Sequence, residues 1–552
     1  MKNIVSLNVA IARNLSLTPT DQLMPLQFDE ILTGPHLIAP YQPTRSGVDY
    51  LNLRQVNLNL MAMCIPGTNN VTRYVRPYSL ICWVYWIYPK LLEKRGNEEA
   101  SSEQLRLFRE KVESLHLWGH RLEGVAGLPG TNSKTPPLIE GLVELSFKAW
   151  GGRRATNTSL QAAVQYGPSL LDLGGIGLLH KADANFYQVT ERGENLAKAF
   201  DDHLRQSFAY ESLIDLDIHQ ASEKDARDLF SYWRIDQTSQ LEQEAFKAAF
   251  WDPESVNDKT AQGGRSSTIR LILDILDSTD KTFTEQDIRD RMAFPRLWGS
   301  KPSALEEGLQ RQSRLWVLLQ FRQLQRLAFE TLMGWVEGLL IYERVKLPNE
   351  IVDKAHASVC EYLGVEPEVD VESLLQAACS DFGTIDDYLA ARESELEWFD
   401  LSRIFEELLQ LNFNEEDGAC PTSFYTLLFL FNCRSWMESD TIIQSNLHDG
   451  GAPRISVGYW FQIVEKLKHR PSRELVDWTI KNLIVSQHFS VGTKRFDGER
   501  IRLRIILEED GLEPLVSRPW HPIITPDRLG ALLSLMVSSG LIRGGDDGYL
   551  GL

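Results

Sequence analysis

The sequence predicts a mainly α-helical, multi-domain protein with small β-hairpins, in which winged-helix-like modules join a helical body. Two observations lead to this fold class. Apolar residues recur at helical spacing through residues 210–440, and two segments, near 170–200 and 529–549, each place a hairpin after an apolar helix. A chain of 552 residues that is 43% hydrophobic has enough apolar material for several cores.

Four domains are expected from three boundaries: a Gly/Pro-rich loop before residue 138, the start of dense helical periodicity near 210, and a break near 445–455. They are an N-terminal helical domain with an aromatic and arginine block (1–137), a winged-helix-like module (138–210), a helical middle domain with an acidic segment (211–445) and a C-terminal winged-helix-like module with a basic hairpin (446–552).

The N-terminal domain is expected to centre on an aromatic helix. Residues 51–60 predict an amphipathic turn or strand, and residues 78–88, nearly all apolar, predict a buried helix that ends at Pro89. Core packing is the first interpretation of the aromatic side chains in this helix. The alternative is a platform on which nucleic-acid bases stack, because Arg73 and Arg76 lie beside the aromatics.

The segment 138–210 has the clearest local pattern. A helix that carries Leu170 ends in glycines, a hairpin follows with Asn185 at its turn, and Thr190 caps a helix over 191–203. Glutamates just after Thr190 also favour a helix that begins there, because negative charges stabilise the N-terminus of a helix. The order helix, hairpin, helix is the winged-helix pattern.

The C-terminal domain repeats parts of this pattern. Residues 529–549 again combine an apolar helix with a hairpin, and residues 474–487 predict another helix. Alternating apolar residues around Asp497-Gly498 predict two strands joined by a tight turn. Five basic residues lie on this predicted hairpin: Lys494, Arg495, Arg500, Arg502 and Arg504. A DNA backbone and an acidic protein are both suitable partners for such a hairpin.

Two further long helices are predicted, over 98–125 and over 311–345. The second could present a basic ridge, since four of its arginines recur at spacings near three, four and eight: Arg311, Arg314, Arg322 and Arg326.

Charge is distributed unevenly along the chain. The net charge is −19, which argues against a uniformly basic nucleic-acid coat. Residues 51–95 and 464–505 nevertheless sum to +5 each, whereas residues 361–417 sum to −15. Two basic islands on an acidic background favour a binding surface, although single charge runs are usually solvated helix faces.

No catalytic constellation is found in the sequence, and neither a metal nor a cofactor is expected. His116 and His120 share a helical face but lack the neighbouring ligands of a zinc site, so core or solvated histidines are the better interpretation. The segment 127–135, GLPGTNSKT, departs from a phosphate-binding P-loop at Ser133. No lysine has an acidic residue two positions before it, as common metal-dependent nucleases would require.

A cytoplasmic protein is expected. No apolar stretch reaches the length of a membrane span, and the first residues lack the apolar centre of a secretory signal. The six cysteines show no framework typical of disulfide-rich secreted domains.

The block PGTNNVTRYVRPYSLICWVYW (66–86), together with 166–200 and 478–515, resembles large bacterial proteins encoded in antiphage defence islands, with Menshen-type systems the nearest association. The resemblance implies a non-catalytic subunit that senses or docks and works with a separate ATPase or nuclease. It assigns no functional residue.

The first hypothesis is therefore a DNA-binding sensor or adaptor subunit of an antiphage defence complex. Under it the basic hairpin contacts phosphates, and Arg73 and Arg76 form a second site. The alternative is a protein scaffold without nucleic-acid contact, whose acidic segment docks a basic partner through Glu393, Glu395 and Glu397. A nuclease with an unrecognised active site is the third hypothesis.

Overall fold

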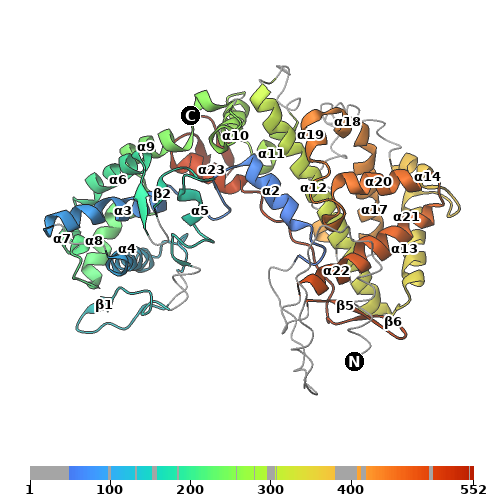
Figure 1. Ribbon diagram of the computed structural model, residues 1–552, viewed down its shortest axis with the longest axis horizontal. Coiled ribbons are helices and arrows are strands. Elements are labelled where there is room, and N and C mark those ends of the chain that lie inside the picture. Colours follow the sequence, from blue (N-terminus) through green and yellow to red (C-terminus); the bar gives the residue numbers. More distant parts are fainter. Residues whose placement is uncertain are drawn as a thin grey trace. The chain divides into compact units, whose positions relative to one another are not determined.

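The computed structural model describes residues 49–96, 101–130, 134–151, 158–182, 186–256, 258–278, 280–294, 305, 307–378, 407–411, 418–495, 502–545 and 547–552. Helices dominate these ranges, and their strands pair as small two-stranded antiparallel ladders (Figure 1). The predicted mainly helical fold with small hairpins is confirmed. No helix in the described ranges is long and apolar enough to cross a membrane.

The chain forms two compact units, and each combines two stretches of sequence. Unit 1 comprises Met1–Asn57 and Leu318–Thr525, and unit 2 comprises Leu58–Val317 and Pro526–Leu552. This division differs from the four expected domains because long-range pairing groups distant segments. Within unit 2, for example, Tyr549 near the C-terminus pairs with Phe283 through two backbone hydrogen bonds.

Unit 2 is built mainly from helices. These are part of α2 (Arg54–Cys64), α3 (Arg76–Lys94), α4 (Ser102–Leu122), α5 (Gly167–Leu170), α6 (Glu191–Leu204), α7 (Tyr210–Ile214), α8 (Glu223–Trp233), α9 (Gln240–Phe250), the 3-10 turn η3 (Pro253–Ser255), α10 (Ala261–Leu276), α11 (Glu285–Ala293), part of α12 (Glu307–Gly338) and α23 (Leu529–Ser538). Its antiparallel strand pairs are β1 (Leu142–Glu144) with β4 (Gln220–Ser222), β2 (Leu179–Lys181) with β3 (Tyr187–Val189), and β7 (Arg543–Gly545) with β8 (Gly548–Leu550).

The predicted turn or strand over 51–60 is wrong, because α2 begins at Arg54. Its buried side chains Val56, Leu60 and Cys64 recur every four residues, which places them on one face of a helix.

The aromatic helix α3 lies in the core of unit 2. Trp83 is fully buried, and its Nε1 donates to Asp201 of α6 at 2.8 Å. The helix does not end at Pro89 as predicted. Buried Leu91 and Leu92 keep it docked for another turn. Core packing is therefore the correct interpretation of this aromatic stretch, and its buried rings do not form a platform for bases.

His116 and His120 on α4 are core histidines, as predicted. His116 Nε2 lies 3.0 Å from the carbonyl oxygen of Trp233, and His120 Nε2 accepts from the backbone N–H of Ile235 at 2.9 Å. Burial lowers the pKa of His120 to about 4, so the ring is neutral at pH 7.

The predicted hairpin and helix cap of the 138–210 segment are confirmed. Strands β2 and β3 pair from Leu179 with Val189, and Oγ1 of Thr190 accepts from the backbone N–H of Gly193 at the start of α6. The helix before this hairpin, however, is only the single turn α5. In the C-terminal repeat, α23 reads LGALLSLMVS and carries none of the arginine, lysine, asparagine or glutamine side chains that make bidentate contacts with bases.

Unit 1 holds the remaining elements. They are the rest of α2 and α12, the π-helical turn η5 (Leu339–Glu343), α13 (Pro348–Leu363), α14 (Val371–Ala378), α17 (Ala419–Asn432), α18 (Arg434–Ser439), α19 (Thr441–Asn446), the 3-10 turn η6 (Ala452–Arg454), α20 (Val457–Leu467), α21 (Ser472–Trp478), the π-helical segment η7 (Thr479–Ser486), α22 (Gln487–Lys494) and the antiparallel pair β5 (Ile505–Glu508) and β6 (Gly511–Pro514).

The long helix α12 is confirmed, but its arginines do not form an exposed ridge. Arg322 is 1% exposed and donates to the carbonyl oxygens of Arg454 and Ile455. Arg326 is buried as well and pairs with Glu330 at 2.7 Å. Both buried arginines bind partners within unit 1, so neither is available on the surface of α12.

The basic hairpin predicted around Asp497-Gly498 is wrong in its first strand, and the hairpin that the structure describes in this region, β5 with β6, carries no lysine or arginine. Helix continues through η7 and α22 to Lys494, where the first strand was expected. The described strands pair from Ile505 with Pro514, and their turn lies at 509–510. Asp497-Gly498 lies outside the described residues.

Candidate nucleic-acid interface

Two of the predicted phosphate contacts form interior ion pairs. Arg76 is 1% exposed, and its Nη1 lies 2.8 Å from Oε2 of the fully buried Glu242. Burial lowers the pKa of Arg76, and the charge of Glu242 opposes this effect. Arg504 binds the carboxylate of Glu337 through Nε at 2.6 Å and Nη2 at 2.7 Å. Both arginines therefore have a structural role, which corrects the assignment made from the sequence.

Six other basic residues, contributed by five separate segments, lie in unit 1, where the hydrogen bonds described below link several of these segments. They are Arg54, Arg454, Lys494, Arg495, Arg502 and Arg518, and we call them the basic cluster.

The side chain of Asn52 links three of the segments that carry the basic cluster. The carbonyl oxygen of Pro453 accepts from Nδ2 of Asn52 at 3.2 Å, and Oδ1 of Asn52 accepts from Nη2 of Arg495 at 3.1 Å. The segments that carry Arg54, Arg454 and Arg495 therefore meet at Asn52.

Arg504 links two of the segments that carry members of the basic cluster. Its Nη2 donates to the carbonyl oxygen of Arg518 at 2.9 Å, and its backbone N–H donates to Nε2 of His488 at 2.9 Å. The guanidinium lies 5.2 Å from the ring centre of Tyr50 and 5.4 Å from that of Trp520. Because His488 belongs to α22, these contacts connect the segment of Arg518 with the helix that ends in the basic cluster.

The charge of the basic cluster is only weakly opposed. Lys494 and Arg518 are exposed and have no ion pair with any described residue. The carboxylate of Asp49 lies 3.9 Å from Arg495, but it is 7% exposed and accepts backbone N–H groups at the start of α2. Arg54 holds a buried Nε without a hydrogen-bond partner among the described residues. The arrangement suits anions that several guanidinium groups share.

The remaining residues predicted to bind a partner do not belong to the basic cluster. Arg73 is exposed in unit 2, with the buried Arg76 as its near neighbour in sequence. Four predicted residues lie outside the described ranges: Arg500, Glu393, Glu395 and Glu397. Sequence reasoning did not select Arg54, Arg454 and Arg518 as site residues. Arg54 is counted only as part of the basic island at 51–95, and the hydrogen bonds that link its segment to those of Arg454 and Arg495 join residues far apart in sequence.

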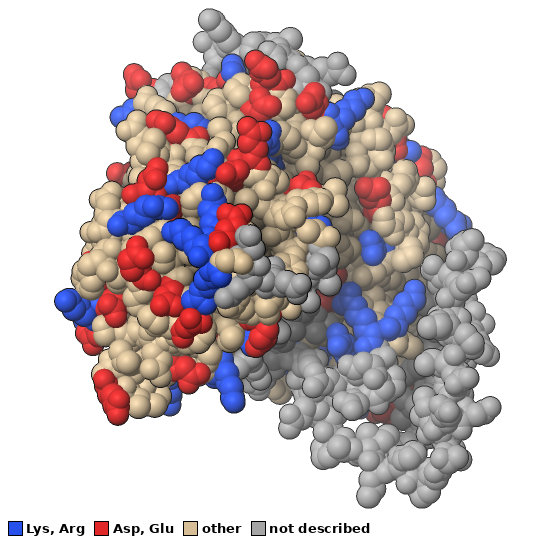
Figure 2. All heavy atoms as spheres, turned by 60° about the vertical axis from the view of Figure 1, so that its left-hand side comes forward, with Lys and Arg blue, Asp and Glu red and all other residues tan. Residues whose placement is uncertain are grey.

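The basic island at 51–95 does not form one surface. Arg54 belongs to unit 1, whereas Arg95 of unit 2 pairs with Asp217 at 2.8 Å. On the face that Figure 2 brings forward, Lys and Arg side chains are interspersed with Asp and Glu. Mixed charge of this kind is typical of a solvated surface.

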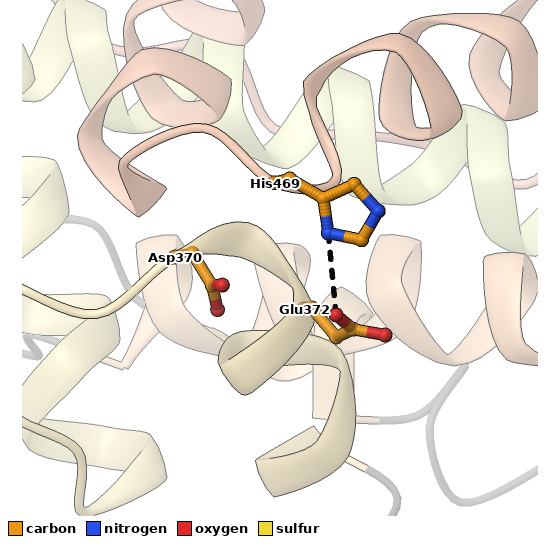
Figure 3. A group of neighbouring side chains, drawn as sticks. All are labelled: Asp370, Glu372 and His469. Carbon is orange, nitrogen blue, oxygen red and sulfur yellow. Dashed lines mark ion pairs between the residues drawn. The ribbon is translucent and has the colours of Figure 1, made fainter.

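One group of side chains has the composition of a metal site (Figure 3). The ligand atoms of Asp370, Glu372 and His469 lie within 4.8 Å of one another. His469 Nδ1 is 3.3 Å from Glu372, and the ammonium of Lys468 is 3.2 Å from the same carboxylate. Asp370 caps α14 by accepting from Ser373. A divalent cation would have to displace Lys468, so we interpret the group as an ion-pair link between α14 and the loop after α20.

A serine–histidine pair is also present in unit 1. Ser472 Oγ lies 2.7 Å from Nε2 of His356, and Cys360 Sγ lies 3.4 Å from the same nitrogen. Ser472 is 0% exposed. A substrate therefore has no access to this hydroxyl, and the contact is one of core packing.

Comparisons with known proteins do not identify the chain. No family model, no curated protein and no solved structure matches it.

Proposed function

We propose that the chain is a DNA-binding sensor or adaptor subunit of a bacterial antiphage defence complex. In this proposal it contacts the DNA backbone through the basic cluster and works with a separate ATPase or nuclease. The defence setting rests on the resemblance described above, and the DNA contact rests on the basic cluster.

The observation that carries the proposal is a set of six cationic residues in unit 1, on segments that hydrogen bonds link at Asn52 and at Arg504. Arginine matches phosphate with its planar fork, and five of the six side chains are arginines. The described helices that precede hairpins, α5 and α23, are a single turn and an apolar helix. Binding is therefore expected to use phosphates and to be independent of base sequence.

A paired charge reversal tests the proposal. Lys494→Glu with Arg518→Glu changes two exposed members of the basic cluster that form no ion pair with described residues. The matched control, Lys134→Glu with Lys148→Glu, makes the same change in net charge at exposed positions of unit 2. Fluorescence anisotropy with labelled duplexes of several sequences measures the affinity of each variant.

We expect the Lys494/Arg518 variant to bind every duplex at least about ten-fold more weakly, while the control binds within about two-fold of the unchanged protein. Equal affinity for both variants contradicts the assignment of the basic cluster. If the unchanged protein binds no DNA at low salt, the scaffold hypothesis replaces this one. Metal-dependent cleavage of the duplex by the purified chain would instead support the nuclease hypothesis.

A further inference from the structure

Unit 2 contains an open pocket of about 490 Å³ that the DNA proposal does not use. Three segments line it: the glycine-rich turn before β2, the first turn of α6 and the first turn of α10. The volume is within the range of small-molecule sites, roughly 300–1,000 Å³.

Close backbone packing forms this pocket. Gly177 has a φ of +85°, a conformation that favours glycine. A Cβ at Gly193, in the first turn of α6, would overlap the carbonyl oxygen of Leu178. Thr190 caps the same turn and donates from Oγ1 to the carbonyl oxygen of Gly177 at 2.7 Å. The glycine-rich turn is therefore held directly against the start of α6.

The two helices present backbone donors to the same pocket. Thr190 and Thr260 cap α6 and α10 by accepting from residues three positions later. The backbone N–H groups of the residues in between (Glu191, Arg192, Ala261 and Gln262, all lining the pocket) take part in no hydrogen bond found among the described residues. The positive ends of two helix dipoles consequently converge on one space.

The buried guanidinium of Arg265 is hydrogen-bonded to two residues that line the pocket, Gly175 and Gln262. Arg265 is 0% exposed and donates to the carbonyl oxygens of Phe250 at 2.8 Å and Gly175 at 3.3 Å. No carboxylate of the described residues pairs with it, and burial lowers its pKa to about 10. Arg265 also donates to the carbonyl oxygen of Pro66 at 3.2 Å and to Oε1 of Gln262, so neutral acceptors satisfy its N–H groups while its charge adds to the positive potential at the pocket.

The amide of Gln262 adds a donor on the same wall. Its Oε1 accepts from Nη2 of Arg265, which fixes the orientation of the amide. Its Nε2 is then a donor, and this buried atom has no hydrogen-bond partner among the described residues. The exposed guanidinium of Arg192 lines the pocket as well.

Two carboxylates at the pocket determine what else the ligand must carry. Asp172 is bound by His180 Nδ1 at 2.6 Å, and Glu191 is the first residue of α6. Both would repel an anion that filled the whole pocket. Both can accept hydrogen bonds from hydroxyl groups or base N–H groups, as carboxylates do with ribose.

We propose that this pocket binds a phosphate ester of mononucleotide size, with its phosphate between the N-termini of α6 and α10 and its hydroxyl-bearing part toward Asp172 and Glu191. The inference is independent of DNA binding, because the pocket lies in unit 2 and the basic cluster lies in unit 1.

Isothermal titration calorimetry of the 552-residue chain tests the inference. The probes are AMP, GMP, CMP and UMP in separate titrations, followed by inorganic phosphate and adenosine. We expect at least one mononucleotide to bind, inorganic phosphate to bind more weakly and adenosine not to bind. The absence of binding by all four mononucleotides at millimolar concentration overturns the proposal. Adenosine binding as tightly as AMP also overturns it, since the phosphate then contributes nothing.

Matched variants locate the bound phosphate. Arg192→Gln removes an exposed charge at the pocket and should weaken mononucleotide binding by about ten-fold or more, the effect of losing a charge-assisted hydrogen bond. The control Arg270→Gln changes an exposed arginine on α10 that pairs with Asp274 and should bind as the unchanged protein does. Because neither side chain is in the core, both variants should fold. Equal weakening by the two, or weakening by neither, contradicts the site.

Discussion

The ion pair between Arg76 and Glu242 is predicted to stabilise unit 2 and to have no part in binding DNA. Glu242 is 0% exposed, and its Oε2 accepts from Arg76 and from the capping residue Ser239. Replacing Arg76 with methionine keeps much of the side-chain volume but leaves this carboxylate without its cation. Removal of one partner from a buried pair costs about 3–5 kcal/mol.

A double-mutant cycle measures this contribution. Arg76→Met alone should lower the free energy of unfolding by about 3–5 kcal/mol, and Glu242→Gln, which keeps a capping side chain, should recover at least about 2 kcal/mol in the double variant. Urea unfolding followed by tryptophan fluorescence reports the transition, since Trp83 and Trp233 are buried in unit 2. A loss below about 1 kcal/mol for Arg76→Met, or weaker DNA binding by the folded variant, would refute this structural role.

Three further predictions concern stability. Arg504→Met should cost about 3–5 kcal/mol in urea unfolding because it strands the fully buried Glu337, and a cost near that of a surface substitution would contradict the pairing. Burial lowers the pKa of His488 to about 4, so the unfolded chain takes up a proton first as the pH falls below about 6.5. From pH 7 to 5 the unchanged protein should therefore lose about 2 kcal/mol more than His488→Gln, and equal losses would count against a neutral buried ring. Thr190→Val should lower the melting temperature through loss of about 1 kcal/mol of capping, whereas Thr190→Ser should not, and no difference between them would rule out the cap.

Local structure was the part of the fold that the sequence predicted well. The cap of α6 by Thr190 could be predicted because a hydroxyl directly before a helical pattern is a common N-cap. The hairpin before it could be predicted because its two strands are close in sequence. The strand expected before Asp497 was wrong, since the π-helical and α-helical turns from Thr479 to Lys494 bury Ile480, Leu483 and Val491 on one side. Tertiary packing decided that conformation.

The candidate site was only partly predictable for the same reason. Lys494, Arg495 and Arg502 were chosen because they are close in sequence, and they do belong to the basic cluster. Arg504 was chosen on the same ground, but its partner Glu337 lies in α12, far away along the chain. Whether an arginine reaches solvent or a buried carboxylate depends on contacts that no local pattern encodes.

The dependence of DNA affinity on salt concentration tests the central proposal most directly. Six phosphate contacts predict a slope of about −5.4 in a plot of log affinity against log salt concentration, which is a loss of about 10³-fold between 50 and 200 mM. With Lys494→Glu and Arg518→Glu the slope should change to about −3.6, and with Lys134→Glu and Lys148→Glu it should remain at about −5.4. An affinity that is independent of salt, or a slope that the Lys494/Arg518 variant leaves unchanged, would contradict phosphate binding by the basic cluster.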